Sequence, residues 1–133
     1  MANITLVPPI MLASHLAPFR ITCVAGVAIA AGEPCYIDAN GQAQLSVATA
    51  SPGSNFDGVP VKAAVAGEAI TLFQQGAKIT VGAHGQAIGS FWYISDTAGL
   101  FSTVSIPTAP ELPVAKAIST TVIEITRMDR PAT

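Results

Sequence analysis

Hydrophobic and polar positions alternate with a period of two over several short segments of the chain. The clearest is residues 121–127, where two isoleucines alternate with a glutamate and a threonine. Residues 69–73 and 77–81 follow the same pattern and are separated by a Gln-Gln-Gly turn signal. Because successive side chains of a strand point to opposite faces of a sheet, this alternation predicts half-buried β-strands.

Glycine and proline separate these segments at intervals of about 8–12 residues, a spacing typical of a β-sandwich or barrel. The chain has 11 glycines and 10 prolines, which leaves little room for helices. Only residues 10–15 could form a short helical turn, bounded by Pro8–Pro9 and Pro18. We therefore predict an all-β fold.

Two parts of the chain, residues 25–73 and 82–126, have the same order of features. Each contains Gly-x-x-x-Tyr-Ile followed by a turn, Asn40-Gly41 in the first and Ala98-Gly99 in the second. A Lys-Ala segment and a strand follow in both. This order predicts two degenerate repeats, the alternative being that all-β chains reuse the same turn signals.

The first of these hairpins contains residues that could carry chemistry, but they change in the second. Cys35 becomes Trp92 and Asp38 becomes Ser95, whereas the glycine, tyrosine and isoleucine recur. The hairpin is thus the recurring feature. We interpret Asp38 as a turn residue whose carboxylate accepts hydrogen bonds from nearby backbone N–H groups.

The composition is unusually poor in charge. Half of the residues are hydrophobic and 11% are charged, against about 25% in typical globular proteins. The chain either has a very apolar core or has apolar surface that other subunits cover, and we favour the second, a permanent assembly. The net charge of −2, with six dispersed Lys and Arg residues, predicts no nucleic-acid partner.

The residue patterns of enzymes and metal sites are missing from the sequence. His15 and His84 are far apart, no local pattern pairs two carboxylates, and no phosphate-binding loop occurs. We expect no enzyme, no cofactor, no metal and no small-molecule substrate. A small hydrolase or isomerase using His84 and Asp96 is the weakest alternative. Cys23 and Cys35 are predicted to be two buried free thiols rather than a disulfide.

Residues 1–20 differ from the rest and are predicted to form an extended N-terminal arm on a single β domain of residues 21–133. Twenty extended residues reach at most about 66–70 Å, more than the diameter of such a domain. The arm should lie in a groove, either on its own domain or on a neighbour. The side chains expected to contact a partner are Ile4, Leu6, Val7, Ile10, Met11, Leu12, Leu16 and Phe19.

The N-terminal stretch also resembles an export signal superficially, but no basic residues precede it and Pro8–Pro9 interrupts its apolar run. No window is long and apolar enough to span a bilayer. We therefore expect a protein that is made and assembled in a cytoplasm, with no membrane partner.

Phe91-Trp92-Tyr93 is the one aromatic cluster of the sequence. Adjacent strand residues point to opposite faces, so either Trp92, or Phe91 with Tyr93, faces outward. We predict that Phe91 and Trp92 contribute to a partner interface. A sugar- or partner-binding platform and plain burial in two layers stay open as alternatives.

Four segments carry a resemblance to a known family. They are AGVAIAAGEP (25–34), DGVPVKAA (57–64), AGEAITL (66–72) and GQAIG (85–89). They resemble the small capsid decoration (cement) proteins of tailed bacteriophages, over about residues 25–126. The resemblance implies a compact β-barrel or tulip-like domain without cofactor. It also implies a homotrimer that binds the major capsid protein on the outer surface of the virion. A carbohydrate- or receptor-binding β module of a phage head fibre or tail is the alternative.

Overall fold

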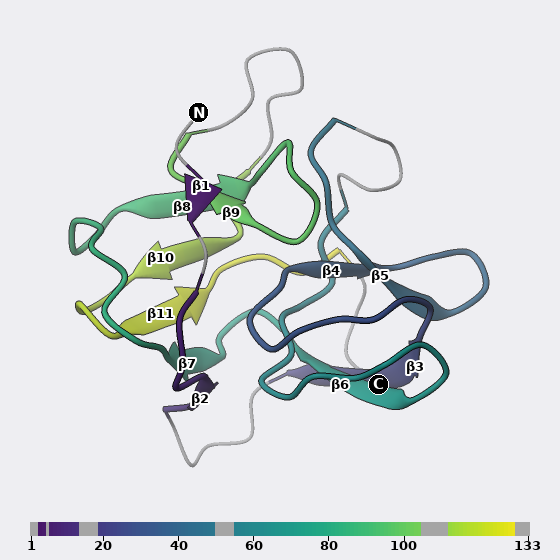
Figure 1. Cartoon of the computed structure of the whole chain (residues 1–133). Coiled ribbons are helices and arrows are strands. Elements are labelled where there is room, and N and C mark those ends of the chain that lie inside the picture. The colour runs from purple at the N-terminus through teal and green to yellow at the C-terminus, as the bar shows by residue number, and fades with distance from the viewer. Residues whose placement is uncertain (1–2, 5, 14–18, 50–54, 105–111, 130–133) are drawn as a thin grey trace.

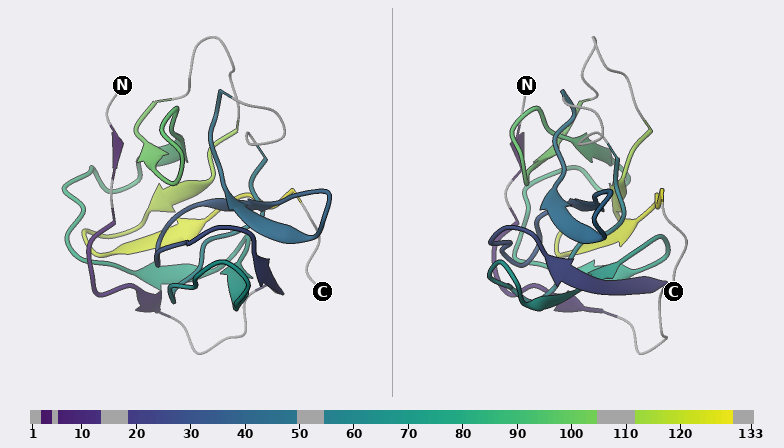
Figure 2. Two further views of the ribbon diagram at one scale, coloured as in Figure 1. Left: turned by 45° about the vertical axis from the view of Figure 1, so that its right-hand side comes forward. Right: turned by 90° about the vertical axis from the view of Figure 1, so that its right-hand side faces the viewer.

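The computed structural model describes residues 3–4, 6–13, 19–49, 55–104 and 112–129. These residues form eleven strands in two sheets, and none of them is helical (Figure 1). The all-β prediction is therefore confirmed. Viewed from the side in Figure 2, the four-stranded sheet lies in front of the seven-stranded sheet.

The seven-stranded sheet is antiparallel throughout. Its order is β1 (Asn3–Ile4), β9 (Phe101–Ser102), β8 (Phe91–Ile94), β10 (Ala115–Ala117), β11 (Val122–Ile125), β7 (Lys78–Thr80) and β2 (Met11–Leu12). The four-stranded sheet has the order β4 (Cys35–Ile37), β5 (Gln42–Leu45), β3 (Arg20–Ala25) and β6 (Ala69–Phe73). In it, β3 and β5 are parallel.

The alternation of hydrophobic residues located the strands well. The predicted strand 69–73 is β6, and β7 and β11 lie within the segments 77–81 and 121–127. The possible helical turn at 10–15 was wrong where the structure describes it, because Met11 and Leu12 pair with Thr80 and Ile79 at the edge of a sheet. An open strand edge offers the backbone hydrogen bonds that one short turn cannot supply.

A closed barrel is not present in the described part of the chain, and this corrects the prediction made from the resemblance. The seven-stranded sheet ends at β1 and β2, and the outermost strands of the four-stranded sheet, β4 and β6, are linked only by the isolated bridges of Cys35 with Gly58 and of Phe73 with Val59. Both halves of the chain contain the expected hairpin, β4–β5 and β8–β9. The later strands differ, because β6 pairs with β3 whereas β11 pairs with β10 and β7. The structure thus does not show a repeat, and the duplication stays a prediction.

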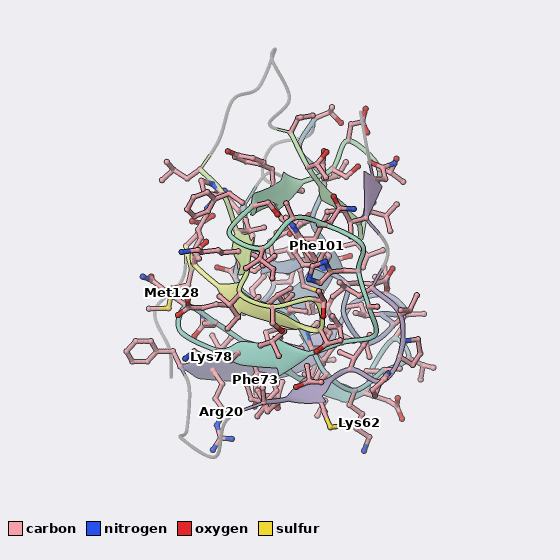
Figure 3. All side chains as sticks on the ribbon, turned by 90° about the vertical axis from the view of Figure 1, so that its left-hand side faces the viewer. Arg20, Lys62, Phe73, Lys78, Phe101 and Met128 are labelled. Atoms are coloured by element: carbon pink, nitrogen blue, oxygen red, sulfur yellow. The ribbon has the colours of Figure 1, made fainter. Side chains whose placement is uncertain are left out.

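Two hydrophobic clusters fill the domain, and β6 belongs to both. The larger is rich in aromatic side chains and contains Phe56, Phe73, Trp92 and Phe101. The smaller contains aliphatic side chains and Cys35, and its described members include no aromatic residue. Leu72 lies in the smaller cluster and its neighbour Phe73 in the larger, as strand alternation requires. In Figure 3, Phe73 and Phe101 lie within the molecule, whereas Arg20 and Lys62 extend outward.

Candidate functional site

The described part of the N-terminal arm lies on its own domain and pairs with both edges of the seven-stranded sheet. Asn3 is opposite Ser102 in β9, and Met11 is opposite Thr80 in β7. Between them, the N–H of Gly82 donates to the carbonyl of Val7 at 2.7 Å. Figure 1 shows this segment running from β1 to β2 across the height of the sheet. The described part of the arm thus contacts its own domain.

The arm side chains named from the sequence divide into an inward and an outward group. Ile4 is buried in the larger core, and Leu6, Ile10 and Leu12 pack against that core and are half-buried. These four residues therefore contact their own domain. Those that extend outward are Val7, Met11 and Phe19, with exposed fractions of 45%, 51% and 56%. Leu16 lies outside the described residues.

Trp92 is buried, which corrects its prediction as a partner-contacting residue. Its side chain has no exposed surface. The ring of His84 meets it edge-on with centroids 5.0 Å apart, and Phe101 lies at 5.7 Å. Its indole N–H donates to Ser90 Oγ at 3.3 Å. The sequence left open which face of β8 points inward, and packing selects Trp92 because its large apolar area stabilises the core most.

Phe91 takes the opposite face of β8 and is 47% exposed. Lys116 Nζ lies 5.7 Å from the centre of its ring, within the range of a cation–π contact. The register continues across the sheet, with Lys116 opposite Glu124 and Glu124 opposite Lys78. This row is called the outer face of the seven-stranded sheet. It combines an exposed aromatic ring with alternating charges, so it can make both apolar and ionic contacts with another protein.

Six further exposed hydrophobic residues were not singled out from the sequence. They are Val24, Val27, Val65, Ile88, Val104 and Leu112, and the last reaches 73% exposure. Five of the six lie outside the strands, in segments where hydrophobic alternation carries no information. A weak sequence signal for exposed turns was present at two of them, because the turn-forming residues Gly89 and Pro113 directly follow Ile88 and Leu112.

His84 has both ring nitrogens engaged by the backbone. Nδ1 accepts from the N–H of Gln86 at 3.0 Å, and Nε2 lies 2.7 Å from the carbonyl of Ser119. Neither contact involves Asp96, the carboxylate that the hydrolase alternative would pair with it. The ring therefore holds the segment around residue 84 against the turn at 119. His15 lies outside the described residues.

The Asp38 prediction is confirmed. Its Oδ1 accepts from the N–H groups of Asn40 and Gln42 at 2.9 and 3.0 Å, and its Oδ2 accepts from the Gln44 amide at 3.0 Å. The bond from the Gln42 backbone is the main cause that lowers the pKa of Asp38 below its ordinary value of 3.8, and the Gln44 amide contributes next. The carboxylate stabilises the turn of the β4–β5 hairpin.

The two cysteines are free thiols, as predicted, but only Cys35 is buried and Cys23 is half-buried. Burial raises the pKa of the Cys35 thiol, and the negative charge of Glu33 raises it further. A thiol that stays protonated is a poor nucleophile and a poor metal ligand.

Two adjoining hollows are lined by described residues. The larger has a volume of about 590 Å³ and lies between β6 and the segment Val61–Ala63. The smaller, about 370 Å³, is lined by residues 28–30 and 63–65, with Glu33 and Glu68. Ala63 and Glu68 border both. The larger is called the β6 groove.

The described residues contain no group of three or more His, Cys, Asp or Glu side chains placed to hold a metal ion. No helix with the length and hydropathy of a membrane span occurs in these same ranges. No protein-family model matches the sequence, and no curated protein is significantly similar to it. A functional proposal therefore depends on the residues of this chain.

Proposed function

We propose that this protein is a capsid decoration, or cement, protein of a tailed bacteriophage. It binds the assembled head at the junctions between subunits of the major capsid protein, on the outer surface of the virion, as a homotrimer. The sequence resemblance over residues 25–126 suggests the family, and the all-β fold agrees with it.

The observation that carries the proposal is the apolar surface of a weakly charged chain. Among the described residues, ten large hydrophobic side chains are 36–73% exposed, whereas the whole chain has only 14 charged residues. Single exposed hydrophobic residues are common, but this number combined with so little charge is typical of a surface that other protein covers. The outer face with Phe91 is one part of that surface.

The fold suits a protein that reinforces a shell. The arm is held at both edges of its sheet, so the inward arm residues stiffen the domain, and Val7, Met11 and Phe19 are left to contact neighbours. A trimer that contacts several capsid subunits makes each further contact effectively intramolecular, which raises avidity by about 10²–10⁴. An interface of about 1,600 Å² per copy would be of standard specific size.

Binding to heads tests the proposal. The purified protein is mixed with expanded, DNA-filled heads and with immature heads of the same phage, and bound protein is measured by co-sedimentation. We expect saturable binding to expanded heads only, and a trimer by mass photometry. A monomer that binds neither kind of head would overturn the proposal.

Charge insertion locates the contact surface. Phe91→Lys, Val24→Lys and Leu112→Lys each place a charge at an exposed position, so the fold should tolerate all three. At least one should weaken head binding by tenfold or more, because an unpaired charge is costly in an apolar interface. Equal binding by all three would contradict the use of this surface.

The alternative, a carbohydrate- or receptor-binding module, depended on Trp92 as an exposed platform. Trp92 has no exposed surface, so that alternative would have to use Phe91 beside Lys116 instead. Glycan binding that Phe91→Ala abolishes, with no binding to heads, would favour it over the cement proposal.

A further inference from the structure

At one edge of the four-stranded sheet, some backbone groups have no hydrogen-bond partner among the residues that the structure describes. In the ladder between β3 and β6, the N–H of Gln74 donates to Phe19 and the N–H of Ala25 donates to Glu68. Because bonded and non-bonded pairs alternate in an antiparallel ladder, the backbones of Ile70 and Leu72 face β3. Those of Ala69 and Thr71 face the opposite edge.

At one end, this edge is occupied. The N–H of Phe73 donates to Val59 and the N–H of Val59 donates to Phe73, both at 3.0 Å. Beyond Val59 the chain leaves the edge, since the carbonyl of Pro60 accepts from Gly32 and Ala64 pairs with Ile29. The β6 groove opens there, between Val61–Ala63 and Ala69–Thr71. No described residue forms a backbone hydrogen bond with Ala69 or Thr71 at this edge.

We propose that an extended segment of the major capsid protein binds in the β6 groove and adds a strand to the free edge of β6. This inference rests on the proposed function and names the part of the surface that receives the capsid chain. The inserted strand would continue the line of Val59 and pair with Ala69 and Thr71.

The geometry of the edge identifies the occupant as polypeptide. Ala69 and Thr71 each present one donor and one acceptor, repeated every two residues or about 6.8 Å, which is the repeat of another strand. The groove floor includes Val61, Ile70 and Phe73, which suit apolar side chains of the inserted segment.

Opposite charges border the groove, Lys62 on one side and Glu68 on the other. Figure 3 shows Lys62 extending outward at this end of the molecule. Lys62 and Glu68 can bind polar groups that flank a short apolar segment of the inserted chain. A second copy of β6 fits less well than a single extended segment, because each copy would bring its own groove-lining segment Val61–Ala63 into the contact.

In the described ranges, the other sheet offers no comparable edge. Its outermost strands are β1 and β2, each only two residues long and supplied by the arm of the same chain. Short edge strands limit pairing with other chains. The four-stranded sheet has instead a five-residue edge strand beside a groove.

The test compares Thr71→Pro with Thr71→Val for binding to expanded heads. Proline removes the N–H that faces the groove but no bond of the β3 ladder, and edge strands tolerate it. Both variants lose the hydroxyl contact between Thr71 and Thr22, so that loss cancels in the comparison. We expect Thr71→Pro to bind about tenfold or more weakly and Thr71→Val to bind like the unchanged protein. Equal binding by both would overturn the inference.

Amide hydrogen exchange of the unchanged protein gives a second readout that needs no variant. Without heads, the amides of Ala69 and Thr71 should exchange quickly, whereas those of Ile70 and Leu72 are protected by β3. On binding heads, Ala69 and Thr71 should become protected. Binding without this protection would overturn the inference and leave the proposed function intact. If the amides of Ala69 and Thr71 become protected when the protein concentration is raised without heads, a second copy of the protein binds this edge. That result would also overturn the inference. Failure of the unchanged protein to bind heads would overturn both.

Discussion

The two sheets of this protein differ in both core and edges. The seven-stranded sheet packs on an aromatic cluster that includes Trp92 and Phe101, and the arm of the same chain occupies both of its edges. The four-stranded sheet packs on small and aliphatic side chains, and the edge of β6 opens onto a groove. The seven-stranded sheet is thus bordered on both sides by its own chain, and the four-stranded sheet is the one to which we propose that another chain adds a strand.

Although their cores and edges differ, the two sheets are not independent folding units. Leu72 and Phe73 place neighbouring side chains of β6 in different clusters, and the pairing of Val59 with Phe73 reinforces this link. We therefore expect one cooperative unfolding transition for both sheets. The predictions that follow test how far the two differ.

The largest effect is expected in the aromatic cluster. Trp92→Ala removes a fully buried ring that contacts His84 and Phe101, and should lower the free energy of unfolding by about 3–5 kcal/mol. Chemical denaturation measures the change. Phe91→Ala, on the exposed face of the same strand, is the matched control and should cost about 1 kcal/mol or less. Equal losses for the two variants would contradict the assignment of faces in β8.

The aliphatic cluster should respond less, although it belongs to the same cooperative unit. Leu72→Ala leaves a cavity among small side chains and should cost about 2–5 kcal/mol. The denaturation midpoint should fall without a change in slope, because the whole domain still unfolds at once. Two separate transitions in this variant would show that the sheets unfold independently.

The arm can be displaced by a substitution at a residue that belongs to neither core cluster. At Gly82 a methyl group would lie 2.8 Å from the carbonyl oxygen of Pro8 and would overlap the side chain of Val7. Gly82→Ala should therefore cost about 1–3 kcal/mol and make the arm more sensitive to limited proteolysis. Adding Val7→Ala should restore part of the loss, and Val7→Ala alone serves as the control. An arm that stays protected in Gly82→Ala would show that it is not held at this point.

The smallest effect is expected at the exposed turn of the four-stranded sheet. The pKa of Asp38 is lower in the folded protein than in the unfolded chain, so its charge stabilises the fold at pH above 3.8. This contribution is lost as the pH falls through the lowered pKa. Asp38→Asn should thus be less stable than the unchanged protein at pH 6–7, and the two should converge at acidic pH. If the stability difference between Asp38→Asn and the unchanged protein is the same at every pH, the lowered pKa of Asp38 is not its cause.

Periodicity predicted the strands from the sequence, because alternation records directly which side chains point inward. It located β6, β7 and β11, and the turn signals located both hairpins. It could not show how the strands pair, so the open sheets were not foreseen. Nor could it choose between Phe91 and Trp92, since both are large and aromatic and only the packing around β8 decides.

The proposed binding surface was harder to predict than the fold. The arm was recognised by its prolines and apolar residues, but sequence alone does not show that Ile4 enters the protein's own core. The free edge of β6 depends on the chain leaving the sheet after Val59, which is a property of tertiary structure. Exposed residues such as Ile88 lie in turns, where hydrophobic patterning carries no signal.

The placement of β1 and β2 has a consequence for how the chain is made. Both are synthesised well before the strands with which they pair, since β7 follows β2 by some 65 residues and β9 follows β1 by nearly a hundred residues. β1 and β2 must therefore stay unpaired with these strands while most of the domain is synthesised. Pairing over such long sequence separations slows folding, so the domain should reach its native state only after β9 has been synthesised.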